Sequence, residues 1–87
     1  MIEVKSSGED IYEVVVEEGD SRSEHSVTLR RDYYDELTGG KISPEELIRR
    51  SFEFLLQREP KGSILSSFDL PVIQRYFPEY EKKIRGG

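Results

Sequence analysis

The stretch His25-Ser-Val-Thr-Leu-Arg-Arg31 alternates polar and apolar residues, and it runs into Asp32-Tyr-Tyr-Asp-Glu-Leu37. Such alternation has the period of two that is typical of a strand with one buried face. Asp32 can cap a short helix, and Gly39 is placed to end that helix in a left-handed conformation. Ser43, followed by a proline and two glutamates, has the composition of a helix N-terminus with a capping box. The sequence therefore predicts a strand, a short helix and a longer helix in succession.

Two further strands are predicted before this one. Residues 11–17 alternate in the same way, and residues 2–5 show a shorter alternation. Residues 19–23 have the composition of a loop, so that the two later strands form a hairpin. In this hairpin, register parity allows Glu13 to lie across from Arg30 as an opposite-charge pair.

The helix that begins after Ser43 is expected to extend over residues 44–58. Its apolar stripe spans roughly 180° and should contact both the sheet and either the C-terminal segment or another subunit. The stripe consists of Leu47, Ile48, Ser51, Phe52, Leu55 and Leu56, with Phe54 at one edge. Residues 70–77 predict a short helix, and residues 79–85 predict a polar, frayed final segment.

These elements predict an α+β fold. We expect an N-terminal antiparallel β-hairpin or three-stranded meander followed by three or four helices, with the sheet packed on the long helix at residues 44–58. The chain has 87 residues, and a chain of this size buries only roughly 60% of its unfolded surface, which supports one core. We therefore expect a single domain at residues 1–83 and a flexible tail at residues 84–87.

Composition narrows the classes of function. The chain contains no cysteine, which fits a reducing compartment, so we expect a cytoplasmic protein. No apolar run approaches the roughly 18 residues of a membrane span, and no signal peptide is evident, so we expect a soluble protein without a membrane partner. The formal net charge of −5 disfavours nucleic acid as a partner.

Nothing in the sequence assembles a reaction site, and we expect a protein that is not an enzyme. His25 is the only histidine, it has no metal-ligand partner at a suitable spacing, and we interpret it as an edge or loop-flanking residue. No glycine-rich phosphate motif is present, and the glycine pair at 39–40 lies between predicted helices. We therefore expect no catalytic residue, metal or cofactor.

The C-terminal third concentrates aromatic and aliphatic residues. Phe68, Tyr76, Phe77 and Tyr80 lie within thirteen residues, more apolar area than one short helix can bury beneath itself. Side chains of this kind are enriched at the cores of protein interfaces. One interpretation is that they only cover the wide face of the long helix, and the other is that they form a contact patch. A non-enzymatic interaction or regulatory protein with a protein partner is the function that we favour.

A resemblance to a known family gives an alternative. Val27-Thr-Leu-Arg30 and Tyr33-Tyr-Asp-Glu-Leu37, followed by the capped helix, resemble ribbon-helix-helix repressors over residues 25–58. The resemblance implies a dimer in which this strand pairs with its twin and its outward side chains enter the major groove of DNA. Thr28, Arg30 and Arg31 would then form the nucleic-acid surface. The chain is accordingly expected to be a monomer or a homodimer.

Two further resemblances are weaker. The ending Lys82-Lys-Ile-Arg-Gly-Gly87 is similar to the Arg-Gly-Gly end of ubiquitin-like modifiers, which implies a modifier as a third function. The chain as a whole, particularly residues 46–56 and Phe68-Asp-Leu-Pro-Val-Ile-Gln-Arg-Tyr-Phe-Pro78, resembles small uncharacterised bacterial proteins, which implies a bacterial origin and indicates no particular activity.

Overall fold

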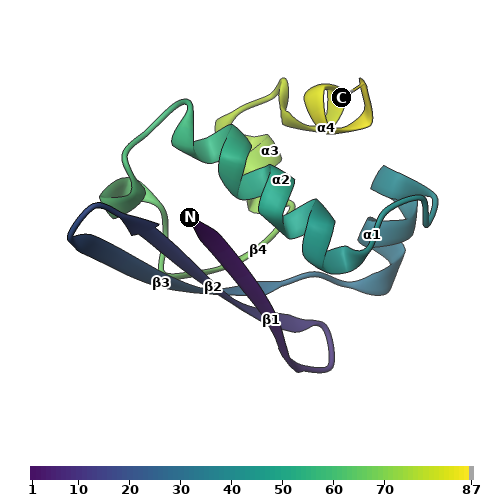
Figure 1. Cartoon of the computed structure of the whole chain (residues 1–87). Helices are drawn as coiled ribbons and strands as arrows, with labels where there is room; N and C mark the ends of the chain where they lie inside the picture. The colour runs from purple at the N-terminus through teal and green to yellow at the C-terminus, as the bar shows by residue number, and fades with distance from the viewer. Residues whose placement is uncertain (87) are drawn as a thin grey trace.

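A computed structural model, which describes residues 1–86, has four strands in one sheet with the helices on one of its faces (Figure 1). The strands are β1 (Ile2–Gly8), β2 (Ile11–Glu18), β3 (Ser21–Thr28) and β4 (Ser67–Asp69), in that order across the sheet. The first three form an antiparallel meander, and β4 pairs with β3 in parallel. The predicted α+β fold with an N-terminal meander is confirmed, whereas β4 was not predicted.

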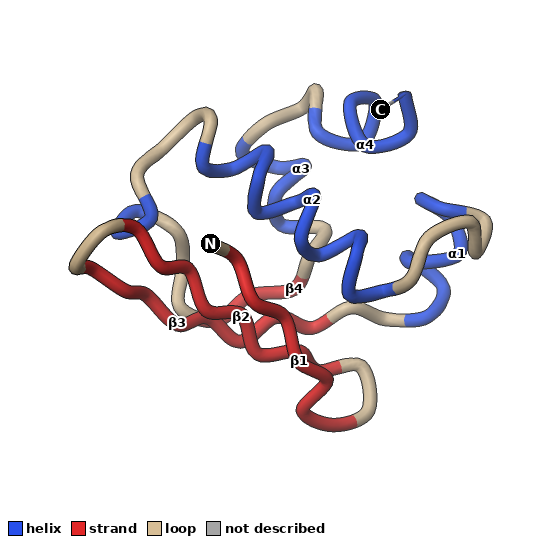
Figure 2. The backbone as a smooth tube through the Cα atoms, in the orientation of Figure 1, coloured by secondary structure: helices blue, strands red, loops and turns tan. Residues whose placement is uncertain are grey.

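The helices pack in a layer above the sheet (Figure 2). They are α1 (Arg31–Thr38), α2 (Pro44–Leu56), the 3-10 turn η1 (Lys61–Ser63), α3 (Val72–Tyr76) and α4 (Tyr80–Gly86). The long helix α2 lies across the sheet, as predicted, and α4 lies on the side of α2 that faces away from the sheet (Figure 1). Helix α2 ends two residues before the expected position 58, since Pro60 removes a backbone donor.

The register of the meander is set by tight turns. Glu18 pairs with Ser21 across a two-residue turn, in which Gly19 adopts φ 58°. This turn is shorter than the predicted loop, so β3 begins four residues earlier than expected, and Glu13 lies opposite Ser26. The predicted pairing of Glu13 with Arg30 is therefore wrong.

The end of α1 and the start of α2 follow the local signals, whereas the prediction of Asp32 as the cap of α1 is wrong, because α1 begins at Arg31 and Asp32 lies in its first turn. Gly39 has φ 61° and its N–H donates to the Asp35 carbonyl at 2.8 Å, as the prediction of a left-handed helix end requires. Ser43 Oγ accepts the Glu46 N–H at 3.0 Å, which confirms it as the N-cap of α2. The expected capping box is incomplete, because the Glu46 carboxylate pairs instead with Arg50 of the next turn at 2.9 Å.

The core lies between the sheet and α2. Val14, Val16 and Val27 point from the sheet toward Leu47 and Phe52 of the helix, and all five side chains are fully buried. Burying a side chain of this type stabilises the fold by about 1.5–3 kcal/mol. The predicted apolar stripe is thus the surface that joins the two layers, although Leu56 at its end is only half-buried.

The C-terminal segment differs from the prediction. Helix α4 continues to Gly86, and Ile84 is half-buried against the core, where a flexible tail was expected from residue 84. The last residue of that tail, Gly87, lies outside the described residues. Within residues 1–86, no helix combines the length and apolar character needed to cross a membrane. Cytoplasmic location stays a prediction.

Candidate protein-binding groove

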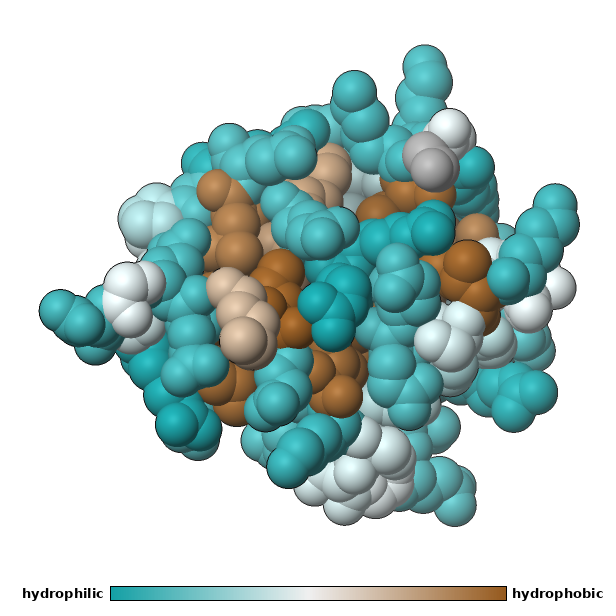
Figure 3. All heavy atoms as spheres, in the orientation of Figure 1, coloured by the Kyte–Doolittle hydropathy of each residue, from teal (hydrophilic) through white to brown (hydrophobic). Residues whose placement is uncertain are grey.

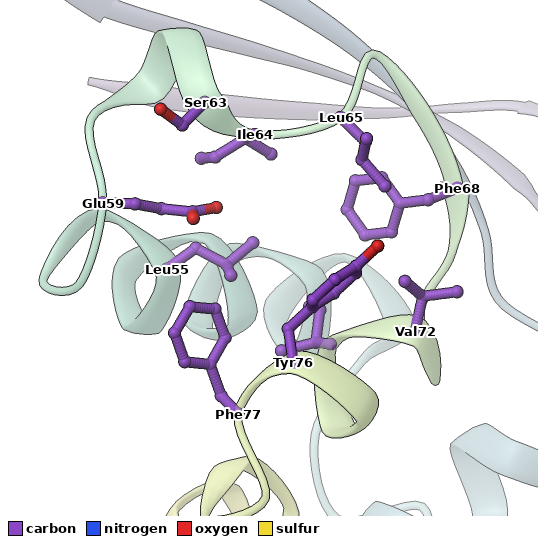
Figure 4. Close-up of a pocket in the computed structure, with 10 residues that line it drawn as sticks. Leu55, Glu59, Ser63, Ile64, Leu65, Phe68, Val72, Tyr76 and Phe77 are labelled. Carbon is purple, nitrogen blue, oxygen red and sulfur yellow. The ribbon is translucent and has the colours of Figure 1, made fainter.

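A groove opens where the end of α2, the segment after it and α3 meet. Its volume is about 340 Å³, at the small end of the range of about 300–1,000 Å³ that ligand sites occupy. It is lined mainly by apolar and aromatic side chains, namely Leu55, Glu59, Ser63, Ile64, Leu65, Phe68, Val72, Ile73, Tyr76 and Phe77 (Figure 4). We refer to this set as the aromatic groove. Its size suits one or two apolar side chains of a partner.

The floor and the rim of the aromatic groove differ in exposure. Leu55, Ile64 and Ile73 are buried and form the floor. At the rim, Tyr76 is 67% exposed and Leu65 is 48% exposed, and both are among the few large apolar residues with such exposure. An exposed tyrosine and leucine above an apolar floor form a surface that gains free energy when a partner covers it.

His25 holds one wall of the groove in place. Its side chain is 3% exposed, and its Nδ1–H donates to the Leu65 carbonyl at 2.8 Å. Nε2 lies 2.9 Å from Ser23 Oγ, so both ring nitrogens have hydrogen-bond partners, and the ring lies 5.2 Å from that of Phe52. The interpretation of His25 as an edge or loop-flanking residue is therefore wrong: the early start of β3 places it inside a strand, on the face toward α2.

Strand β4 fixes the other end of the same wall. The Ser26 N–H donates to the Ser66 carbonyl at 2.7 Å, and the Leu70 N–H donates to the Thr28 carbonyl at 2.9 Å. Phe68, between these two bonds, stands 6.1 Å from the Phe52 ring. The wall that carries Leu65 and Phe68 is thus anchored to the sheet, so the aromatic groove is largely preformed.

Glu59 places a negative charge in the apolar lining. Its N–H donates to the Leu55 carbonyl at 2.9 Å, which keeps it against the end of α2. Figure 4 shows its side chain reaching into the groove toward Ile64, across from Tyr76. Among residues 1–86 its carboxylate makes no salt bridge within 4.0 Å and no hydrogen bond. The carboxyl end of a helix also carries the negative end of its dipole, so this side of the groove favours a cation.

The structure brings together three of the four residues predicted for protein interaction. Phe68, Tyr76 and Phe77 all line the aromatic groove. Tyr80 does not: it is 0% exposed and lies behind α2, with its ring 5.3 Å from that of Phe54. Its hydroxyl is 2.6 Å from Ser51 Oγ, and burial raises the pKa of Tyr80. Tyr80 is therefore a core residue.

Polar contacts secure the helix that carries Tyr80. Tyr33 Oη donates to Glu81 Oε2 at 2.9 Å, and Arg58 pairs with Glu79 at 3.0 Å. The Gln74 side chain accepts the Glu81 N–H at 2.9 Å, which links α3 to α4. The prediction of a frayed final segment is wrong, because Tyr80 and these contacts attach it to α1, α2 and α3.

The residues predicted for nucleic-acid binding do not form one surface on a free strand. Thr28 ends β3 and pairs with Ile11 on one side and with Asp69 on the other. Arg30 precedes α1, and Arg31 is its first residue, where it pairs with Asp35 at 3.5 Å. DNA binding through these residues stays a prediction, and β3 has neighbours on both sides in the sheet.

A second hollow lies between α2 and α4. It has a volume of about 300 Å³ and contains three basic side chains, Arg50, Arg58 and Lys83. Two of these already pair with Glu46 and Glu79. In the part of the chain that the structure describes, no group of three His, Cys, Asp or Glu side chains is placed to hold a metal ion. The aromatic groove is therefore the main candidate site.

Leu65 and Glu59 are among the residues of the aromatic groove that the sequence did not indicate. Leu65 lies in a stretch without periodicity, and Glu59 is one acid among 18 in the chain. The hydrogen bond from His25 and the pairing of β4 with β3 together position Leu65 on the wall of the groove, and no local sequence signal indicates contacts between positions 40 residues apart. Comparison of the chain with protein-family models, curated protein sequences and solved structures found no match, so the function must be inferred from the groove itself.

Proposed function

We propose that this chain is a non-enzymatic protein-interaction domain whose aromatic groove binds an apolar segment of a partner protein. The observation that carries the proposal is the exposure of Tyr76 and Leu65 above a buried apolar floor. Tyrosine is enriched among the residues that contribute most to binding, and such residues cluster at pockets that a partner can dehydrate. The only imidazole of the chain, that of His25, is 3% exposed, which keeps it from direct contact with a substrate in solution.

Charge defines the partner further. Glu59 offers a carboxylate at one end of the apolar groove, and the chain has a net charge of −5. A partner segment with an apolar side chain next to a lysine or arginine would fill the groove and meet this carboxylate. Opposite charges on the two partners also accelerate their association and discriminate against acidic segments. The occupant that we propose is therefore a basic, apolar peptide segment.

Selection of short random peptides displayed on phage, with the purified full chain as bait, tests the proposal. We expect the recovered peptides to share an apolar residue beside a lysine or arginine. Replacing Tyr76→Ala should weaken their binding by about tenfold or more, because an anchor of this kind contributes on the order of 2 kcal/mol. Ile11→Ser is the matched control, since Ile11 is exposed on the opposite face of the sheet.

Two results would contradict the proposal. If the recovered peptides share no apolar residue, the groove does not discriminate among peptide sequences. Peptides that bind Tyr76→Ala as well as the original chain, but not Ile11→Ser, would place the site on the open face of the sheet. Circular dichroism of both variants establishes that the comparison is made between folded proteins.

A further inference from the structure

Strand β1 is an open edge of the sheet. It pairs only with β2 among the described strands. Met1, just before β1, directs its backbone N–H and C=O groups toward Glu17 at the end of β2 and exchanges two hydrogen bonds with it, at 2.6 and 2.8 Å. In an antiparallel pair such residues alternate along the strand, so Glu3 and Lys5 also direct their backbone groups toward β2. The N–H and C=O groups of the intervening residues 2, 4 and 6 consequently point outward. Within residues 1–86 no other segment pairs with them.

The side chains along this edge carry a charge pattern that is complementary to itself. Glu3 and Lys5 lie on the face of the sheet that carries no helix, because they alternate with the buried Ile2 and the half-buried Val4. Neither takes part in a salt bridge with another described residue. An antiparallel copy of β1 centred on Val4 would place Glu3 of each chain opposite Lys5 of the other.

That register also satisfies the backbone. It pairs Val4 with Val4 and Ile2 with Ser6, and all of these residues have outward N–H and C=O groups, so each pair can exchange two hydrogen bonds. Centring the pair on Glu3 or on Lys5 instead would oppose like charges, which is unfavourable. A shift by one residue would turn the apolar face of one strand to the wrong side of the sheet. Charge therefore selects the Val4-centred register from those that backbone hydrogen bonding allows.

An apolar strip lies beside this edge. Figure 3 shows hydrophobic residues gathered on the surface between β1 and α2, around the N-terminus. Met1, which precedes β1, is 77% exposed, and Val4 of β1 is half-buried. Antiparallel pairing of edges places the helices of both copies on the same side of one continuous sheet. The second copy would thus cover the strip as well as the open backbone groups.

We propose that β1 pairs with β1 of a second copy of this chain, in the antiparallel register centred on Val4, and so forms a two-fold symmetric dimer with an eight-stranded sheet. This interface is separate from the aromatic groove, which lies beyond the opposite edge of the sheet beside β4. The dimer would present two aromatic grooves. The proposal of a dimer does not depend on what these grooves bind.

Charge reversal tests the register. Glu3→Lys and Lys5→Glu each convert both intermolecular ion pairs into repulsive pairs, so sedimentation equilibrium at low salt should show dimerisation weakened about fivefold or more in each variant. An equimolar mixture of the two variants restores opposite charges at both positions. We expect this mixture to form a heterodimer about as stable as the original dimer. Ser6→Pro removes an outward N–H while keeping the bonds to β2, and it should also weaken the dimer.

Amide hydrogen exchange locates the interface with an internal control. The Val4 and Ser6 amides should exchange slowly at concentrations where the dimer forms and rapidly on dilution. The Glu3 and Lys5 amides, bonded to β2, should stay protected at both concentrations. A chain that remains monomeric at high concentration would overturn the proposal. A mixture of the two charge variants that associates no better than each alone would do so too, as would a dimer in which the Val4 and Ser6 amides stay unprotected.

Discussion

Replacing Ser51 by alanine should destabilise the fold more than replacing Tyr80 by phenylalanine, although both changes remove the same hydrogen bond. Ser51 Oγ donates to the Leu47 carbonyl at 2.8 Å, so its single proton is used, and Tyr80 Oη must donate across the 2.6 Å contact. Ser51→Ala therefore leaves a buried hydroxyl donor without an acceptor. Tyr80→Phe leaves the serine bonded to Leu47 and vacates only an acceptor position.

The magnitudes follow from this asymmetry. A buried donor without an acceptor costs about 1–3 kcal/mol, and the better helix propensity of alanine offsets about 0.5 kcal/mol of this, so Ser51→Ala should cost about 0.5–2.5 kcal/mol. Tyr80→Phe should cost about 1 kcal/mol or less. The double variant removes both polar partners, so it should be more stable than Ser51→Ala alone.

Urea denaturation at neutral pH, followed by circular dichroism, gives the three free energies of unfolding. A chain of 87 residues with one core is expected to unfold in one cooperative transition, which makes these differences comparable. The reasoning would be refuted if Tyr80→Phe cost more than Ser51→Ala. Additive costs in the double variant would refute it equally, since they would mean that the two hydroxyls do not depend on each other.

Three further predictions concern pH, a turn and the wall of the groove. Burial raises the pKa of Tyr80 and of Tyr33 above the usual value of about 10, so the folded state holds these protons more tightly than the unfolded state does. Their contribution to stability should be complete below pH 10 and should be lost as the pH rises further, and Tyr80→Phe should reduce this loss in urea titrations across that range. Gly39→Ala forces a side chain into φ 61° and should cost about 1 kcal/mol by the same assay. His25→Ala removes the bond to Leu65 and leaves a cavity beside α2, so it should cost about 2 kcal/mol or more and speed amide exchange at Ser26.

Local signals in the sequence account for the meander, for the end of α1 and for the start of α2. Gly39 and Ser43 act through their own backbone or their nearest neighbours, so their roles can be read without tertiary information. The buried residues recur at every second position, Val14 and Val16 in β2 and His25 and Val27 in β3, and this period specifies which face of each strand is buried whatever the register.

The elements that were missed depend on contacts between distant positions. Strand β4 is three residues long, and its pairing with β3 joins positions about forty residues apart, so no periodicity reveals it. Helix α4 was predicted to fray because it is mostly charged, yet Tyr80 and Ile84 have the spacing of four residues that places them on one helix face. His25 shares the strand parity of Val27, which was a usable signal for a buried position.

The same distinction applies to the candidate site. The concentration of aromatic residues directed attention to residues 68–80, and of these Phe68, Tyr76 and Phe77 line one groove. Composition could not separate the exposed Tyr76 from the buried Tyr80, because that difference arises from how α3 and α4 turn at Pro78. Nor could it identify Glu59, whose importance comes from the apolar surfaces around its carboxylate.

The most direct test of the account measures the coupling between Glu59 and the basic residue of a bound peptide. Isothermal titration with a selected peptide, and with the same peptide carrying norleucine in place of its lysine, is performed on the original chain and on Glu59→Gln. We predict that the lysine peptide loses affinity in Glu59→Gln and the norleucine peptide does not, with a coupling of about 1 kcal/mol. Equal affinities for both peptides in both proteins would contradict the proposed recognition of a basic, apolar segment by the aromatic groove.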